Sequence, residues 1–405
     1  MRNLFHKLPG FAADYSGAML AVSHMGCLRI LHGQGGCSGG VCTCDDYESE
    51  TDDWRTLFSK ISEIETITGN DEKLVEMIAD AVDSVDPGWI LLLGSPIPMI
   101  IATDYRAIAS KVEEKTGIPA LFVDTTGIET YDVGESKVYR VMIERAERLA
   151  PSGDQRHGTV YVIGDTPLNG WTEKMREAYG RDILQNADGA VKVVFAGGGE
   201  AYSFGKIGDD ITVRKADMGD WKAIDRSSLN IAVSASACEA VKTLENSFGT
   251  PYRCFGTGHA WENFDIRIAP QICAGETQIF SNEKVLLVGE QFLMNNLRRY
   301  LRRNFGARDV TVVGFFAFRE EFAEDGDETL NDEDDYMSFL ERTGPYDVVL
   351  GDPVLQPMGG YLRSFISCPE LALSSRLLTR ELPVLYGRNI GEIIAAGQCN
   401  GDRDR

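Results

Sequence analysis

An alternation of short apolar runs with longer segments of helical periodicity constrains the fold of this chain most. Residues 89–93 are apolar, the turn residues Gly94-Ser95-Pro96 follow, and residues 103–116 have an amphipathic helical pattern. Further apolar runs lie at 120–123, 159–163, 191–195, 229–233, 284–288, 310–313, 348–350 and 382–385. Strands that alternate with helices in this way indicate βαβ units whose sheets are covered on both faces. We therefore predict an α/β fold of doubly wound, Rossmann-like domains with parallel sheets.

Three such blocks can be drawn along the chain, at residues 1–155, 156–280 and 281–405. Ligands of open α/β sheets bind at the carboxyl ends of the strands, so three blocks can enclose a site between them. The last block contains residues 319–335, in which ten of the side chains are acidic. Their spacing does not match a calcium-binding loop, which needs ligands at alternating positions. We expect a solvated acidic loop there.

The charge balance and the apolar stretches exclude several classes of partner. The chain has 40 Lys and Arg residues against 62 Asp and Glu residues, a net charge of −22, which disfavours nucleic acids and anionic membrane surfaces. The longest apolar stretch, residues 89–102, is interrupted by Pro96 and Pro98 and is shorter than the ~20 residues of a membrane-spanning helix. The first residues lack an apolar signal core. We expect a soluble, cytoplasmic protein with no nucleic-acid or membrane partner.

Four of the nine cysteines, Cys27, Cys37, Cys42 and Cys44, fall in one short glycine-rich segment. In a reducing compartment, clustered thiols indicate metal or redox chemistry more often than disulfides. Glycines let backbone N–H groups approach a metallocluster closely, and such donors tune iron–sulfur clusters. The spacing matches no standard ferredoxin, and a zinc site would usually show a second cysteine pair. On spacing alone, a glycine-rich turn with incidental thiols remains an alternative.

Two other segments are weaker candidates for chemistry. Phe195-Ala-Gly-Gly-Gly199 can form a turn between a strand and a helix, where a helix N-terminus binds phosphate. His259 follows Gly256-Thr-Gly258 and is a candidate for a central cavity, although a lone histidine is more often structural. The chain has no GxxxxGK[ST], GxSxG or HExxH motif, so ATPase, serine hydrolase and zincin activities have no support.

The segment His32-Gly-Gln-Gly-Gly-Cys37 resembles the His-Gly-Pro-x-Gly-Cys motif of the nitrogenase component 1 family. Leu93-Gly94-Ser95-Pro96 resembles the strand end that carries a second cluster cysteine in that family. The likeness continues over most of the chain, at residues 65–74, 117–123, 162–165 and 248–252. It implies three α/β domains and an iron–sulfur cluster, [4Fe–4S] or larger, at a subunit interface.

The resemblance also implies roles for single residues. Cys37 takes the place of a cluster ligand, and Cys27, Cys42 and Cys44 are near enough in sequence to be co-ligands. His32, Gly33 and Gly36 would shape the loop. Ser95 replaces the second cluster cysteine, and it is either a poorer ligand to iron or the N-cap of a helix that begins near Ile97, a cap worth ~1 kcal/mol. We favour the cap.

What the family does sets the expected function. A separate ATP-hydrolysing iron protein passes electrons to component 1, which pairs with a related subunit or a second copy and reduces a small molecule. Val233 stands near the position of the cysteine that holds the catalytic cofactor, and no histidine follows His259. We therefore expect a small unsaturated or tetrapyrrole-like substrate rather than dinitrogen. The alternative is a scaffold that assembles a metallocluster. A periplasmic-type binding protein is disfavoured by the thiols and the missing signal core.

Overall fold

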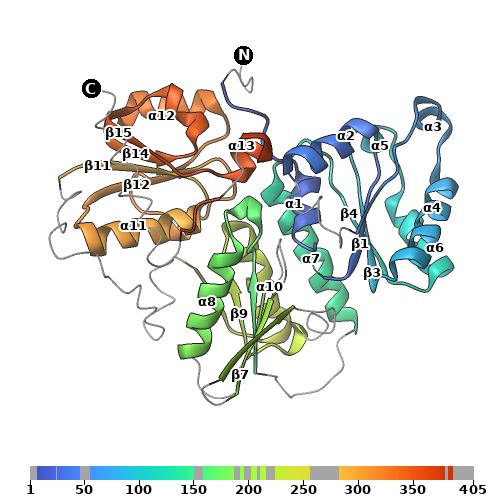
Figure 1. The fold of residues 1–405 in the computed structure, drawn as a ribbon. Coiled ribbons are helices and arrows are strands. Elements are labelled where there is room, and N and C mark those ends of the chain that lie inside the picture. The colour runs from blue at the N-terminus through green and yellow to red at the C-terminus, as the bar shows by residue number, and fades with distance from the viewer. Residues whose placement is uncertain are drawn as a thin grey trace.

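Three α/β units follow one another along the chain, each built around its own sheet (Figure 1). The computed structural model describes residues 7–23, 25–45, 55–149, 158–186, 192–195, 202–207, 210–215, 224–255, 282–378 and 382–385. Within these residues, no helix combines the length and the apolar composition that crossing a membrane requires.

The first sheet is fully parallel, with the strand order β2-β1-β3-β4. Its strands are β1 (Cys27–Leu31), β2 (Thr56–Phe58), β3 (Trp89–Leu93) and β4 (Ala120–Val123). Because successive side chains of a strand point to opposite faces, Leu28 and Ile30 pack in one buried cluster while Cys27 and Leu31 pack in another. The surrounding helices are α1 (Asp14–Leu20), α2 (Gly35–Gly40), α3 (Glu63–Thr68), α4 (Asp71–Val85), α5 (Pro96–Ile100), α6 (Tyr105–Thr116) and α7 (Tyr131–Leu149), with the short π-helix η1 (Val41–Asp45) after α2.

The middle sheet has the order β10-β9-β5-β6-β7-β8. Its strands are β5 (Thr159–Ile163), β6 (Lys192–Phe195), β7 (Tyr202–Ile207), β8 (Asp210–Lys215), β9 (Leu229–Ala232) and β10 (Tyr252–Cys254). Strands β10, β9, β5 and β6 are parallel, whereas β7 is antiparallel to both β6 and β8. Its helices are α8 (Glu173–Asn186) and α10 (Cys238–Phe248), with short 3₁₀ helices η2 (Pro167–Asn169), η3 (Ile224–Arg226) and η4 (Ala235–Ala237).

The predicted α/β fold with parallel sheets is confirmed, and the middle sheet extends it with an antiparallel strand. Strand β7 runs antiparallel because few residues separate it from β6, and a parallel crossover needs a dozen or more. Residues 196–200, predicted as a phosphate-binding turn before a helix, lie outside the described residues. The next element that the structure describes is strand β7.

The third sheet is fully parallel, in the order β13-β12-β11-β14-β15. Its strands are β11 (Lys284–Val288), β12 (Asp309–Gly314), β13 (Glu328–Thr329), β14 (Tyr346–Gly351) and β15 (Tyr361–Ser367). The helices are α11 (Gln291–Phe305), α12 (Glu333–Thr343) and α13 (Leu371–Leu378), with 3₁₀ helices η5 (Glu320–Phe322) and η6 (Pro353–Met358).

The acidic segment 319–335 is not the solvated loop that was predicted. It contains β13, which adds an edge strand to the third sheet. The Asp327 side chain is 1% exposed, and both its oxygens accept hydrogen bonds from Arg298 of α11, at 2.8 and 2.7 Å. Glu324 pairs with Arg302 at 2.7 Å. Basic residues on α11 therefore hold this segment against the sheet.

Each sheet has the same winding, and this positions the candidate site. The first strand of each unit is central, with its successor on one side and a later strand on the other. The crevice between the central strand and that later strand, at the carboxyl ends, is where doubly wound folds bind ligands. The three crevices lie between β1 and β3, between β5 and β9, and between β11 and β14.

Candidate functional site

The first crevice brings together the turn after β1 and the turn after β3. His32 and Gly33 follow β1, and α2, which carries Cys37, begins at Gly35. Gly94 and Ser95 follow β3. The crevice therefore gathers the segments that the sequence singled out, 32–37 and 93–96.

His32 holds the first turn against the end of β2. Its side chain is fully buried, and Nδ1 lies 2.8 Å from Oγ of Ser59. The Gly33 N–H donates to the same Oγ at 3.0 Å, and the His32 and Tyr105 rings pack in a T-shaped arrangement with their centroids 5.9 Å apart. Burial lowers the pKa of His32 to about 4, so the imidazole is neutral near neutral pH. These contacts make His32 a structural support of the loop.

Gly33 and Ser95 touch so closely that Gly33 tolerates no side chain. A Cβ on Gly33 would lie 2.2 Å from Oγ of Ser95 and 3.8 Å from Cβ of Cys37. Ser95 and Cys37 thus face the same small space. At Gly36, by contrast, nothing lies within 4 Å of an added Cβ, so no contact in the described residues requires this glycine.

The Ser95 hydroxyl does not make the helix cap that was favoured for it. Ser95 occupies the N-cap position of α5, but its side chain forms no capping hydrogen bond. Ser95 is fully buried, and its Oγ has no hydrogen-bond partner among the residues that the structure describes. A buried hydroxyl without a partner costs about 1–3 kcal/mol, so this atom destabilises the fold unless something else bonds to it.

Three thiols lie on consecutive short helices beside this crevice. Cys37 is on α2, Cys42 and Cys44 are on η1, and all three are partly exposed. Burial and the nearby negative charges of Cys37 and Asp45 raise the pKa of Tyr15 on α1. Burial, followed by the charge of Asp45, also raises the pKa of Cys44. The thiol-bearing loop therefore packs against α1.

Contacts on both sides fix the end of this loop. Asp45 accepts a hydrogen bond from Oγ of Ser16 at 2.6 Å. Arg376 of α13 donates to the carbonyl of Cys42 at 3.3 Å, so the third unit also contacts the loop.

Cys27 is the one predicted co-ligand that the structure places elsewhere. It begins β1, its Cα pairs with Trp89 at the amino edge of the sheet, and it is 0% exposed. Four residue steps along a strand separate it from Leu31, roughly 13 Å. Burial raises its pKa. Cys27 is a core residue, and its assignment as a ligand was wrong.

The loop does not form a complete metal site on its own. Among the described residues, no three His, Cys, Asp or Glu side chains are arranged so that they could hold a metal ion. The candidate His259 lies outside the described residues, as do Cys273 and Cys399.

The second crevice is filled by a residue that sequence reasoning missed. Glu135 of α7 is fully buried between the ends of β5 and β9, and it accepts hydrogen bonds from Thr166 Oγ1, Ser236 Oγ and Asn169 Nδ2 at 2.6, 2.6 and 2.8 Å. Burial raises its pKa to about 8. Its position among the buried Tyr131, Val138 and Tyr139 on α7 is a helical pattern that could have revealed it.

The third crevice retains a small cavity. Its lining includes Glu290, Cys368 and Glu370, and its volume of about 20 Å³ gives room for about one water molecule. Glu290 accepts from the N–H groups of Ala235 and Leu293, both at 2.9 Å, and burial raises its pKa to about 7. Glu290 therefore joins the third unit to the start of η4 in the middle unit.

Three kinds of comparison relate this chain to known proteins, and the first is with curated relatives. It is 22% identical over 171 residues to the nitrogenase iron-molybdenum cofactor biosynthesis protein NifE of Rhizobium meliloti, which covers 40% of this chain and 36% of the relative. It is 26% identical over 125 residues to the protein of the same name from Bradyrhizobium diazoefficiens, which covers 29% and 23%. The chain thus spans about a third or less of these curated relatives.

The fold agrees with solved structures over nearly its whole length. The structure "Nitrogenase Cp1 at pH 6.5" matches with a TM-score of 0.66 and 14% identity, covering 100% of this chain and 96% of that one. "Nitrogenase Cp1 at pH 5" matches with a TM-score of 0.64 and 15% identity, covering 99% and 90%. The family model described as nitrogenase component 1 type oxidoreductase matches residues 13–258, more than half of the chain. The chain therefore belongs to the nitrogenase component 1 type oxidoreductase family, as a divergent member.

Proposed function

We propose that this chain is the cluster-holding subunit of a nitrogenase-like complex. Cys37 is the principal ligand of an iron–sulfur cluster, [4Fe–4S] or larger. The cluster takes electrons from an ATP-hydrolysing iron protein and passes them to a small substrate other than dinitrogen. The observation that carries this proposal is that a Cβ added at Gly33 would lie 2.2 Å from Ser95 Oγ and 3.8 Å from Cys37 Cβ, so the two side chains lie close together at the first crevice.

The chemistry of this contact suits a cluster. Thiolates are the ligands that iron–sulfur clusters require, and Cys37 is partly exposed beside the crevice. The unpartnered Oγ of Ser95 would gain a partner from a cluster seated there, either as an alkoxide ligand to iron or by donating its O–H to a sulfide. Cys42 and Cys44 remain candidates for further ligands, whereas Cys27 is a core residue and is no ligand in this proposal.

The remaining ligands come, in this proposal, from a second chain. The described residues offer no three-ligand group. Four glycines of α2, Gly35, Gly36, Gly39 and Gly40, have no atom within 4 Å of an added Cβ, although each glycine costs the helix about 1 kcal/mol relative to alanine. Close approach by a cluster or another subunit would explain that cost.

Apolar side chains surround the same end of the first sheet. Ile64 and Ile67 on α3 are 73% and 86% exposed, and Ile100 on α5 is 70% exposed. Figure 1 shows α2, α3 and α5 at one end of the first unit. Apolar surface of this kind marks protein contacts, so we propose that a related subunit or a second copy of this chain covers it. A reducing cytoplasm is the compartment that suits such thiols.

A cluster-assembly scaffold is the second candidate function. One observation favours it: the curated relatives are named as cofactor biosynthesis proteins.

Turnover separates the two functions. The anaerobic complex is mixed with its iron protein, ATP, a reductant and candidate unsaturated or tetrapyrrole substrates. A reductase forms many equivalents of reduced product per cluster. A scaffold consumes no substrate and instead transfers its metal to an acceptor apoprotein, which would overturn the reductase assignment.

A further inference from the structure

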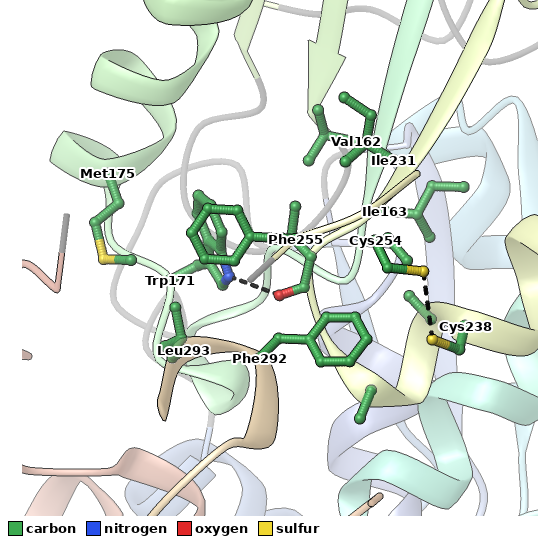
Figure 2. Packing of buried hydrophobic residues seen from close by; sticks show 14 of the residues in the cluster. Val162, Ile163, Trp171, Met175, Ile231, Cys238, Cys254, Phe255, Phe292 and Leu293 are labelled. Carbon is green, nitrogen blue, oxygen red and sulfur yellow. Dashed lines mark hydrogen bonds between the residues drawn. The ribbon is translucent and has the colours of Figure 1, made fainter. Parts of the chain in front are cut away.

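Two thiols in the middle unit lie together, away from the first crevice. Cys238 is the first residue of α10, and Cys254 is the last residue of β10. Their sulfur atoms are 3.8 Å apart, and neither is in a disulfide bond (Figure 2). Both residues are buried, at 0% and 3% exposure. The nitrogenase-like function proposed above makes no use of this pair.

The pair is arranged for one thiol to ionise while the other keeps its proton. With Cys238 as donor, the hydrogen bond between the sulfurs lowers the pKa of Cys254 and raises that of Cys238. Lys242 and Arg319 lie close enough for their positive charges to favour a thiolate at either sulfur. A thiolate is the reactive form of cysteine towards oxidants.

The surroundings select the kind of oxidant that can reach the sulfurs. Figure 2 shows the pair among buried apolar side chains, which include Ile163, Ile231 and Phe255. A charged, bulky disulfide would lose its hydration on entering such a site. A small neutral hydroperoxide would lose much less.

We propose that Cys238 and Cys254 are a reversible dithiol–disulfide couple that hydroperoxides oxidise. The Cys254 thiolate attacks the peroxide, and an S–O bond forms as the O–O bond breaks. The leaving oxygen takes up the proton that Cys254 released on ionising, and it departs as water from hydrogen peroxide or as an alcohol from an alkyl hydroperoxide. The Cys238 sulfur then displaces hydroxide from the sulfenic acid, and its proton leaves with that hydroxide as water. Two electrons pass from the two thiols to one hydroperoxide, which is reduced to water, or to water and an alcohol.

Closing this bond acts on the contacts that join the three units. The sulfurs must approach from 3.8 Å to about 2.05 Å, which draws the start of α10 towards β10. Helix η4 directly precedes Cys238. Within it, the Ala235 N–H bonds to Glu290 of the third unit, and the Ser236 hydroxyl bonds to Glu135 of the first. Oxidation therefore strains the junction beside it.

Peptide mapping of the full-length protein tests the couple. Anaerobic protein is treated with hydrogen peroxide, the remaining thiols are blocked with N-ethylmaleimide, and trypsin digestion is done without reductant. Cleavage after Arg226, Lys242, Arg253 and Arg267 places the two cysteines in separate peptides, 227–242 and 254–267, with no other cysteine in either. We expect these peptides linked in most molecules, and separated again by dithiothreitol.

Two controls make the result specific. Cys254→Ser should abolish the link and leave Cys238 open to N-ethylmaleimide, whereas Cys368→Ser, at another buried thiol, should preserve it. Oxidised glutathione at the same concentration should form the link more slowly than peroxide. Peroxide that adds oxygen to these thiols without linking them, or that links Cys238 to a different cysteine, contradicts the couple. Equal rates with both oxidants contradict the assignment to hydroperoxides. Neither outcome bears on Cys37 or on the proposed cluster.

Discussion

At the scale of single residues, the turn after β1 was the easiest part to foresee and Ser95 was the hardest. The spacing from His32 to Cys37 is local, so the sequence alone marks it. The surroundings of Ser95 depend on Gly33, which is distant in sequence and comes within contact only when β1 and β3 pair. Sequence favours an N-cap for a serine before Pro96, yet the hydroxyl is buried without that bond.

Replacing Ser95 distinguishes a helix cap from a buried hydroxyl without a partner, because the two roles predict opposite changes in the free energy of unfolding. In metal-free protein, Ser95→Ala should raise the free energy of unfolding by about 1 kcal/mol, because it removes a buried hydroxyl that has no partner. Ser62 is a true helix cap in the same unit, so Ser62→Ala should lower it by about 1 kcal/mol. Urea unfolding measures both. If Ser95→Ala lowered the free energy of unfolding as much as Ser62→Ala, Ser95 would be a helix cap after all. In cluster-loaded protein, Ser95→Cys should shift the reduction potential.

At the scale of elements, apolar runs located most of the strands, but long-range contacts decided the rest. Strands β7 and β8 have no continuous apolar run, and they form an antiparallel hairpin that the sequence did not indicate. The acidic side chains of 319–335 predicted a solvated loop, because the sequence does not show that Arg298 and Arg302 of α11 pair with two of them. The role of Glu135 on α7 could not be predicted either, because the groups that bond to it belong to the middle unit.

The Glu135 carboxyl should make the stability depend on pH. Its pKa is about 8 in the folded chain, raised from an ordinary value of 4.5. A raised pKa means that the folded state holds the proton more tightly, so its contribution is fully present below pH 4.5 and is lost as the pH rises through 8. Between these values the stability should fall by about 1.4 kcal/mol per pH unit from this group.

A glutamine at this position has no proton to lose. Glu135→Gln should therefore flatten the pH dependence of urea unfolding between pH 5 and pH 8, a window taken from the shifted pKa. The stability of the Glu135→Gln variant should still fall with pH below about pH 7, because the raised pKa of Glu290 contributes a dependence of the same sign. Glu144→Gln, at a half-exposed position on the same helix, is the control. An unchanged slope in Glu135→Gln would show that Glu135 is ionised in the folded protein.

At the scale of the whole molecule, three sheets were foreseen but not the contacts between units. The N-terminal segment crosses to the third unit, where the Leu8 N–H donates to Glu333 at 3.0 Å and the Ala12 N–H donates to the carbonyl of Ala372 at 3.0 Å. Such contacts join residues more than three hundred positions apart, and no local pattern announces them. Ile64, Ile67 and Ile100 are exposed on α3 and α5 of the first unit, where we propose that another chain binds.

The exposed apolar surface of α3 and α5 predicts that the protein forms an oligomer or a complex with a related subunit. We expect at least a dimer whose interface includes residues 34–44 of the thiol-bearing loop and the apolar surface of α3 and α5. Ile67→Asp and Ile100→Asp should weaken the dimer, because each places a charge in an apolar contact. Leu362→Asp, at an exposed apolar residue of β15 in the third unit, should not. Light scattering under anaerobic conditions measures the mass, and a monomer with full iron content would contradict a shared cluster.

The most direct measurement is the iron and acid-labile sulfide content of the anaerobically purified complex, with and without Cys37. The wild-type complex should contain both, together with charge-transfer absorption from the near ultraviolet into the visible. Cys37→Ala should lose most of the iron and this absorption, while Cys368→Ala, at a buried thiol of the third unit, should keep them. A wild-type complex without iron or sulfide, or equal iron loss in both variants, would contradict the assignment of Cys37 as the principal cluster ligand.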